Sequence, residues 1–234
     1  MTRPLVLLPG MMCDERLFAQ QIAVLGRDRD VIVPKLTGAT SMEALAENVL
    51  ADAPPCFALA GVSMGGILAM ECARQAQHRI THLALIDTNP FAEREEMKQR
   101  RAAQLKAVES GLLKSVMRED MKPNYFIDPA DGIALRDLCM EMALSLGATA
   151  FIEQSMALRD RPDYCSTLRR VTCPALILCG RHDRLCPVER HEAMKQMMPH
   201  ARLCIIEDAG HLPTIETPDQ VTLALKNLLE IQDG

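Results

Sequence analysis

The chain has 234 residues, of which 48% are apolar and 24% are charged, with 26 basic residues against 31 acidic ones. These values describe a single globular domain with a full core, and they exclude collagen-like, disordered and coiled-coil proteins. No basic block stands clear of acids, so the sequence predicts no nucleic-acid partner. The densest charge run, residues 93–101, mixes acids with arginines and is interpreted as a solvated helix face.

Strictly apolar runs such as Cys56–Ala60 are far shorter than the roughly 18 residues of a membrane-spanning helix. The apolar run that follows Arg3 is also too short for the apolar part of a signal peptide. The nine cysteines form no CxxC pair, and none stands at metal-ligand spacing from a histidine. The sequence therefore predicts a cytoplasmic protein with reduced thiols, no membrane span, no metal and no cofactor.

Short apolar runs alternate with helical patterns along the first part of the chain and again near its end. Such continuous apolar strands, separated by crossover helices, predict an α/β fold with a mostly parallel, doubly wound sheet of about six strands. Strands are expected at Leu5–Leu8, Val31–Val33, Cys56–Val62, Leu83–Ile86, Ala175–Cys179 and Leu203–Ile206. Helices are expected over 14–25, from Ser41 to Pro54, and over Met64–Gln77, Val188–Met198 and Pro218–Ile231.

Between Asn89 and Arg170 only short helical patterns appear, interrupted by glycines and prolines. We therefore expect one domain, 1–234, with its core at 1–89 and 171–234 and a helical lid inserted at 90–170. Six methionines lie in this insertion, and a few of them are expected to line an apolar pocket. The expected substrate contacts are Met12, Phe91, Tyr125, Phe126 and Leu212.

The most informative motif is Gly61-Val62-Ser63-Met64-Gly65, a G-x-S-x-G pattern directly between an expected strand and an expected helix. A strand-to-helix turn this sharp brings the backbone close to its neighbours, and glycine at the flanking positions avoids clashes. The serine hydroxyl is then held at a helix N-terminus, which favours developing negative charge. Ser63 is the predicted nucleophile.

A serine nucleophile needs a base, and His211 is the best placed of the six histidines. It follows the expected strand Leu203–Ile206, at the sheet edge where parallel folds present catalytic groups. His182 is set aside because it adjoins the candidate acid Asp183. The other histidines are interpreted as surface or capping residues: His78, His82, His191 and His200.

Three aspartates compete for the role of the acid that orients this base. Asp183 follows the strand Ala175–Cys179 and is favoured. Asp87 ends the strand Leu83–Ile86 and stays open as an alternative. Asp208 precedes His211 by only three residues, which is too near to approach the ring from behind.

The order Ser63, Asp183, His211 resembles the α/β-hydrolase fold superfamily. Leu7–Met12 is similar to the oxyanion loop of that family, Leu178–Asp183 to its acid-bearing loop, and Gly210-His211 with Glu216-Thr217-Pro218 to its G-H-x4-E-x-P ending. The resemblance implies an oxyanion hole formed by the backbone N–H groups of Met11 and Met64.

These residues predict a serine hydrolase that cleaves a small, fairly apolar carboxylic ester or thioester through an acyl-enzyme. A C–C bond hydrolase or a proton-abstracting lyase with the same triad is the alternative. A ligand-binding receptor that keeps the fold without turnover ranks last, because all three triad residues are intact. A small molecule is the expected partner, and the oligomeric state is left open, with a homodimer among the options.

Overall fold

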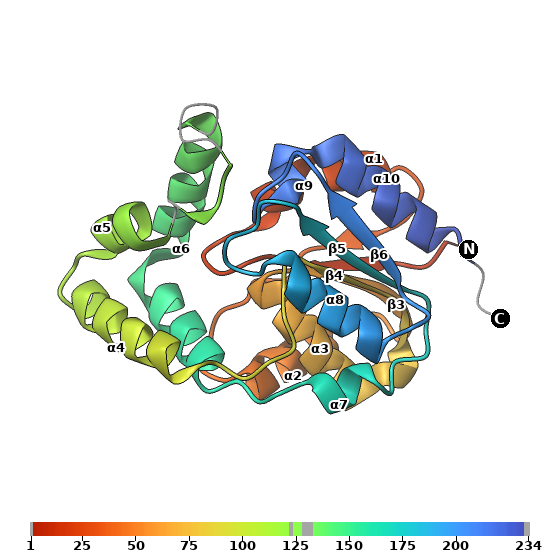
Figure 1. Ribbon diagram of the computed structural model, residues 1–234, viewed down its shortest axis with the longest axis horizontal. Helices are drawn as coiled ribbons and strands as arrows, with labels where there is room; N and C mark the ends of the chain where they lie inside the picture. Colours follow the sequence, from red (N-terminus) through yellow and green to blue (C-terminus); the bar gives the residue numbers. More distant parts are fainter. Residues whose placement is uncertain (1, 122–123, 128–132, 232–234) are drawn as a thin grey trace.

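The computed structural model describes residues 2–121, 124–127 and 133–231 (Figure 1). Six strands form one sheet in the order β2-β1-β3-β4-β5-β6, and every neighbouring pair is parallel. The strands are β1 (Leu5–Leu8), β2 (Val31–Ile32), β3 (Phe57–Val62), β4 (Ile80–Ile86), β5 (Ala175–Gly180) and β6 (Arg202–Ile206). The predicted parallel α/β sheet is thus confirmed.

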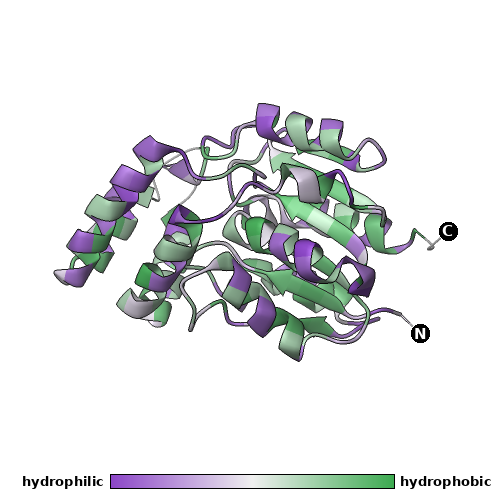
Figure 2. Ribbon diagram, turned by 90° about the horizontal axis from the view of Figure 1, so that it is seen from below, coloured by the Kyte–Doolittle hydropathy of each residue, from purple (hydrophilic) through white to green (hydrophobic). Residues whose placement is uncertain are grey.

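Helices cover both faces of the sheet, as crossover connections between parallel strands require. One face carries α1 (Ala19–Leu25) and α10 (Pro218–Leu229), and the short α9 (Pro213–Glu216) packs beside α1. The opposite face carries α2 (Met42–Asp52), α3 (Met64–Ala76) and α8 (Val188–Met197). Figure 2 shows the strands as hydrophobic, whereas hydrophilic residues lie on the outer sides of the helices.

Alternate residues of each strand enter two separate hydrophobic clusters. In β1, Val6 and Leu8 join the cluster under α2 and α3, whereas Leu5 and Leu7 join the cluster under α1 and α10. All of β3 is likewise buried. Because both sides of each strand are covered, the strands read as unbroken apolar runs, which is why they were visible in the sequence.

Several element ends differ from the sequence-based prediction. The helix expected over 14–25 begins as a 3₁₀ turn, η1 (Glu15–Phe18), in which the Asp14 side chain accepts a hydrogen bond from the Arg16 N–H at 3.0 Å. The edge strand β2 is only two residues long. A second 3₁₀ turn, η2 (Gln77–Arg79), follows α3, and β4 then begins at Ile80, earlier than expected.

The chain between β4 and β5 is helical, and its described residues contain no strand. Figure 1 shows its helices up to residue 159 beside the carboxyl ends of the strands, whereas the last, short helix packs against α3 and α8. Gly147, at φ 82°, kinks the longest of these helices. The segment comprises α4 (Glu95–Glu109), α5 (Leu113–Ser115), the π-turn η3 (Val116–Met121), α6 (Ile133–Arg159) and α7 (Cys165–Leu168). Within the described part of the chain, no helix has the length and apolar character needed to cross a membrane.

Candidate active site

Ser63 occupies the sharp turn between β3 and α3, with a φ of 54°. The turn is possible because its flanking glycines have no side chains. A Cβ atom on Gly65 would lie 2.0 Å from the Leu8 carbonyl oxygen, and one on Gly61 would lie 2.2 Å from the Gly65 carbonyl oxygen. The Ser63 N–H donates to the Ile86 carbonyl at 2.9 Å, which ties the turn to β4.

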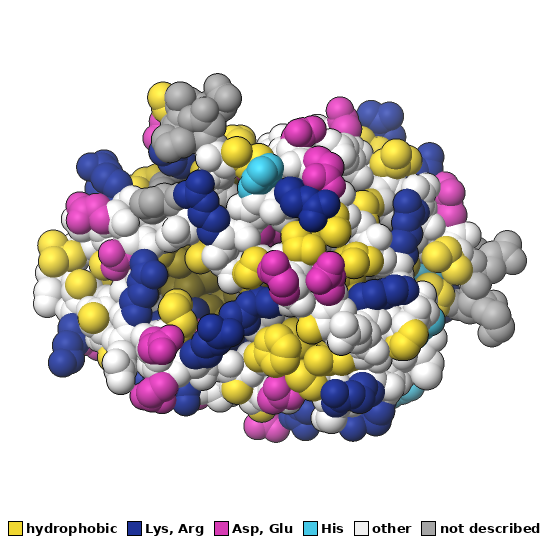
Figure 3. Space-filling view, in the orientation of Figure 1, with side chains coloured by type: hydrophobic (Ala, Val, Ile, Leu, Met, Phe, Trp, Pro, Cys, Tyr) yellow, Lys and Arg dark blue, Asp and Glu magenta, His cyan; other side chains and the backbone are white. Residues whose placement is uncertain are grey.

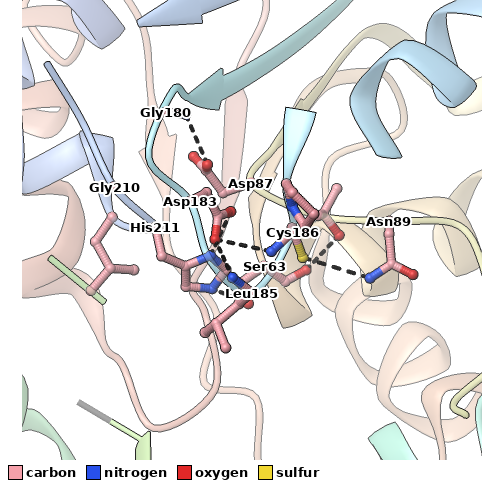
Figure 4. A network of polar contacts seen from close by, with 12 residues as sticks. Ser63, Asp87, Asn89, Gly180, Asp183, Leu185, Cys186, Gly210 and His211 are labelled. Atoms are coloured by element: carbon pink, nitrogen blue, oxygen red, sulfur yellow. Dashed lines mark hydrogen bonds and ion pairs between the residues drawn. The ribbon is translucent and has the colours of Figure 1, made fainter. Parts of the chain in front are cut away.

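A chain of hydrogen bonds joins three side chains from three separate loops (Figure 4). His211 Nε2 lies 2.9 Å from Ser63 Oγ, and His211 Nδ1 lies 2.8 Å from Asp183 Oδ2. The second carboxylate oxygen, Asp183 Oδ1, accepts the N–H groups of Leu185 at 2.7 Å and Cys186 at 2.9 Å. Burial favours the neutral carboxyl, but His211 and these donors hold the pKa of Asp183 at about 2.

The loop that carries His211 is fixed from behind by Glu216. Its carboxylate accepts the N–H of Gly210 at 3.0 Å and the N–H of Leu212 at 3.0 Å. The backbone N–H of His211 itself donates to the Tyr125 carbonyl at 2.8 Å. The acidic residue of the G-H-x4-E-x-P ending therefore has a structural role here, since it holds the peptide groups on both sides of the histidine.

Asp87, the alternative acid, is fully buried and does not hydrogen-bond to His211. Its Oδ1 accepts the Gly180 N–H at 2.9 Å. Burial and the neighbouring Asp183 raise the pKa of Asp87 well above its ordinary value, which favours its neutral form. The structure thus brings Asp183 into contact with His211, whereas Asp87 bonds to Gly180 instead.

The loop after β1 lies against Ser63, because a Cβ atom on Gly10 would be 3.6 Å from Ser63 Cβ. Among the described residues, the N–H groups of Met11 and Met64 have no hydrogen-bond partner. The next amide, that of Met12, donates to Gln154 Oε1 at 2.8 Å. The loop can therefore offer the unpaired amide of Met11 beside Ser63 while the amide of Met12 is held by Gln154 of α6.

Two histidines interpreted as surface residues are buried. His191 accepts the Thr88 N–H at Nε2, at 3.1 Å, and its Nδ1 lies 3.3 Å from the Pro187 carbonyl. Burial lowers the pKa of His191 to about 4. His82 lies 2.8 Å from the Ile231 carbonyl. The surface interpretation was wrong for both. A buried histidine ring can hydrogen-bond to a backbone N–H or carbonyl that has no other partner, and the sequence does not show where such backbone groups lie.

A cavity of about 400 Å³ opens over Ser63 and His211, between the sheet edge and the helical segment. Among the expected substrate contacts, Tyr125 and Leu212 line it. Met12, Phe91 and Phe126 lie outside its described lining, and Phe91 instead packs under the Arg190 guanidinium at 6.0 Å. Of the six methionines in the helical segment, Met97 and Met121 reach the cavity.

The wall of this cavity that comes from the helical segment is charged, which the sequence did not predict. Glu93 and Arg101, at the two ends of the run interpreted as a solvated helix face, are 7% and 13% exposed at their side chains. Glu93 Oε2 accepts Arg101 Nε at 2.9 Å and Arg161 Nη1 at 2.8 Å. The solvated-face interpretation holds for the exposed Glu95 and Glu96 but was wrong for this buried pair.

One cluster in the described chain has metal-ligand spacing, since donor atoms of Asp183, Cys186 and His211 lie within 4.8 Å of one another. Both ring nitrogens of His211 are already engaged with Asp183 and Ser63. Burial also raises the pKa of the Cys186 thiol, so the thiolate that a metal would need is disfavoured. We assign the cluster to the hydrogen-bonded triad and not to a metal.

A parallel α/β sheet with a serine on the strand-to-helix turn after β3 is typical of one class of proteins, the α/β hydrolases. Residues 5–224 match the model of the alpha/beta hydrolase family. The chain belongs to that family, and the resemblance seen in its motifs is confirmed.

Several proteins similar to this chain are named esterases. A pimeloyl-[acyl-carrier protein] methyl ester esterase from Aromatoleum aromaticum is 27% identical over 256 residues, which cover 98% of this chain and 99% of that protein. The solved structure of a thermophilic esterase from Thermogutta terrifontis (malate bound) is 29% identical, with a TM-score of 0.90, covering 97% of this chain and 89% of the other. An enol-lactonase from Burkholderia xenovorans shares the fold, with a TM-score of 0.89 and 19% identity, covering 99% of this chain and 92% of that one. The prediction of an ester-acting hydrolase is confirmed at this level.

Proposed function

We propose that this protein is a serine esterase that cleaves a small carboxylic ester or thioester through an acyl-enzyme. The observation that carries the proposal is the unbroken chain from Ser63 Oγ through the imidazole of His211 to Asp183, with links of 2.9 and 2.8 Å. Hydrogen bonds of this length connect a nucleophile, a general base and an orienting acid.

In this mechanism, His211 Nε2 takes the proton from Ser63 Oγ as the oxygen attacks the ester carbonyl. Asp183 holds the other side of the ring, fixes its tautomer and stabilises the imidazolium that forms. The negative charge on the carbonyl oxygen is stabilised by the backbone N–H groups of Met11 and Met64, each of which is worth roughly 3 kcal/mol in comparable sites.

The tetrahedral intermediate collapses when His211 gives the proton to the leaving group, which is the oxygen of an alcohol or the sulfur of a thiol. The acyl group is then bonded to Ser63 Oγ. A water molecule, activated by His211 as general base, attacks this acyl-enzyme and releases the carboxylic acid.

We also propose that residues 90–170 act as a lid on a core formed by 1–89 and 171–234. Met97 and Arg101 of α4 and Leu158 of α6 line the same cavity as Ser63, so this segment forms the wall opposite the nucleophile. The cavity volume of about 400 Å³ lies within the range of roughly 300–1,000 Å³ typical of small-molecule sites.

A fluorophosphonate probe tests the proposed function, because it labels only an activated serine. We expect wild type to label and to hydrolyse p-nitrophenyl esters or acyl thioesters of one chain-length class, and Ser63→Ala to do neither while keeping its thermal unfolding transition. Labelling without ester turnover would favour the C–C hydrolase or lyase alternative. A folded wild type that does not label would contradict the mechanism and favour a receptor.

A further inference from the structure

The cavity over Ser63 carries an excess of positive charge. Six arginines and three acids are among its described lining residues. Figure 3 shows Lys and Arg side chains around a hollow with a hydrophobic floor, between the helical segment and the sheet. Three of these arginines are exposed, but Arg101 and Arg161 are largely buried against a single acid, Glu93. Because burying a charge without a partner is unfavourable, this unbalanced buried cation points to a negatively charged ligand.

Within this wall, one carboxylate is shared by two buried arginines. Glu93 binds Arg101 through Nε at 2.9 Å, and it binds Arg161 through Nη1 at 2.8 Å and Nη2 at 3.1 Å. Two further donors of Arg161 are used, since its Nε donates to the Phe91 carbonyl at 3.0 Å and its Nη1 to the Leu158 carbonyl at 3.0 Å. Each of the three guanidinium nitrogens of Arg161 therefore bonds to the lid segment.

Arg101 is not engaged in this way. Beyond its bond to Glu93, its one other hydrogen bond within the described chain runs from Nη1 to the sulfur of Met11 at 3.7 Å, and a thioether is a weak acceptor. Among the described residues, Nη2 of Arg101 has no partner. Two guanidinium nitrogens thus remain available at a surface that Ser63 shares.

The position of Arg101 relates it to the reaction centre. Its guanidinium contacts the side chain of Met11, whose amide we assign to the oxyanion, and Ser63 and Met64 line the same cavity. Apolar side chains, including Met97, Ile67 and Leu158, line the space as well. A ligand that fits would be apolar along its length and anionic at the end that reaches Arg101.

We infer that Arg101 is a specificity residue that binds a carboxylate on the substrate, so that the preferred substrate is an ester of a molecule with a second, free carboxylate. This inference rests on the proposed function and adds a substrate class to it. The planar guanidinium pairs with a carboxylate through two parallel N–H groups, which Lys cannot reproduce.

Matched esters that differ by one charge test this inference. Monomethyl half-esters from succinate to suberate are each compared with the methyl ester of the alkanoic acid of equal length, such as monomethyl adipate with methyl hexanoate. A second pair, O-acetyl ω-hydroxyhexanoate and hexyl acetate, places the carboxylate on the alcohol. We expect wild type to prefer the charged member of at least one pair, by kcat/KM.

In Arg101→Gln, the ratio of kcat/KM for the charged ester to kcat/KM for its uncharged partner should fall about 30-fold or more, because the substrate carboxylate has lost the guanidinium that pairs with it. Arg101→Lys should restore only part of it. The matched control is Arg118→Gln, an exposed arginine of η3 outside the described cavity lining, which should keep the wild-type preference. An equal preference in Arg101→Gln and Arg118→Gln, or none in wild type for either set of esters, would overturn the inference.

A measurement on wild type alone covers the case in which Arg101→Gln does not fold. Adipate should slow the labelling of Ser63 by an uncharged fluorophosphonate probe, whereas adipamide at equal concentration should not. Equal protection by both compounds would contradict a carboxylate site at Arg101. Failure of wild type to label at all would contradict the proposed function instead, so the two failures are distinguishable.

Discussion

Asp87 and Asp183 are neighbouring buried carboxyl groups at the ends of adjacent strands, yet only Asp183 contacts the histidine (Figure 4). The pKa of Asp183 is lowered to about 2, whereas burial and the charge of Asp183 raise that of Asp87 well above its usual value. Two adjacent carboxylates cannot both ionise at low cost. Burial and the charge of Asp183 therefore favour the neutral form of Asp87, whose Oδ2 has no hydrogen-bond partner among the described residues.

Replacing these two residues by asparagine should have unequal effects on catalysis. Asp183→Asn should lower kcat by about 10⁴-fold, because the amide favours the wrong tautomer of His211 and cannot stabilise the imidazolium. Asp87→Asn should change kcat less than about tenfold, since the amide resembles the neutral carboxyl already present. Steady-state kinetics on an ester substrate provide the measurement. A larger loss in Asp87→Asn would move the orienting acid to β4.

Asp87 should also make the protein less stable as the pH rises. The unfolded chain releases the Asp87 proton near the ordinary pKa of about 4, whereas the folded chain retains it, so the unfolded state gains from each further unit of pH. Asp87→Asn should therefore gain stability over wild type by about 1.4 kcal/mol per pH unit, from about pH 4 up to the raised pKa. Urea unfolding of both proteins at pH 5, 6 and 7 measures this, and a constant difference would show that Asp87 is ionised when folded.

His191 should make the protein less stable as the pH falls, whereas Asp87 does so as the pH rises. Its pKa is lowered from 6.5 to about 4 by burial, so below pH 6.5 the unfolded chain binds a proton that the folded chain refuses. Stability should be lost as the pH falls through this window, by on the order of 3 kcal/mol in all. His191→Gln should be less stable at pH 7 but lose less between pH 7 and pH 4. Parallel acid dependence of the two proteins would contradict the prediction.

Gln154 should couple the helical segment to the reaction. It accepts the Met12 N–H at 2.8 Å and donates to the Leu36 carbonyl at 2.9 Å. Gln154→Leu leaves that buried N–H without an acceptor, which should cost about 1–3 kcal/mol of stability and lower kcat about tenfold through displacement of the loop.

The control is the neighbouring Glu153→Gln, which retains an acceptor for the Gly38 N–H that now bonds Glu153 at 2.7 Å. Chemical unfolding and ester kinetics of both variants should separate them. If Gln154→Leu turned over ester at the wild-type rate, the Met12 amide would have no part in positioning the oxyanion loop.

The sheet and the three hydrogen-bonded residues Ser63, Asp183 and His211 could be predicted because the sequence signals for them are local. A buried parallel strand is a continuous apolar run, and the constraints on the turn at Ser63 are written into Gly61 and Gly65. The cavity wall could not be predicted in the same way. Glu93 and Arg101 look like any charged helix surface until Arg161, far along the chain, is brought against them by α6. Likewise, no local pattern marks Gln154 as the partner of Met12.

Among the residues that the structure describes, three other than glycine have positive φ, namely Met12 at 57°, Ser63 at 54° and Asp87 at 43°. They follow β1, β3 and β4, which are consecutive in the sheet, and each such conformation costs roughly 1–3 kcal/mol. The folded core must supply this energy before any substrate arrives. A trade-off between stability and activity is thus built into three adjacent strand ends, and selection for heat resistance alone would favour glycine there, at the expense of a preformed site.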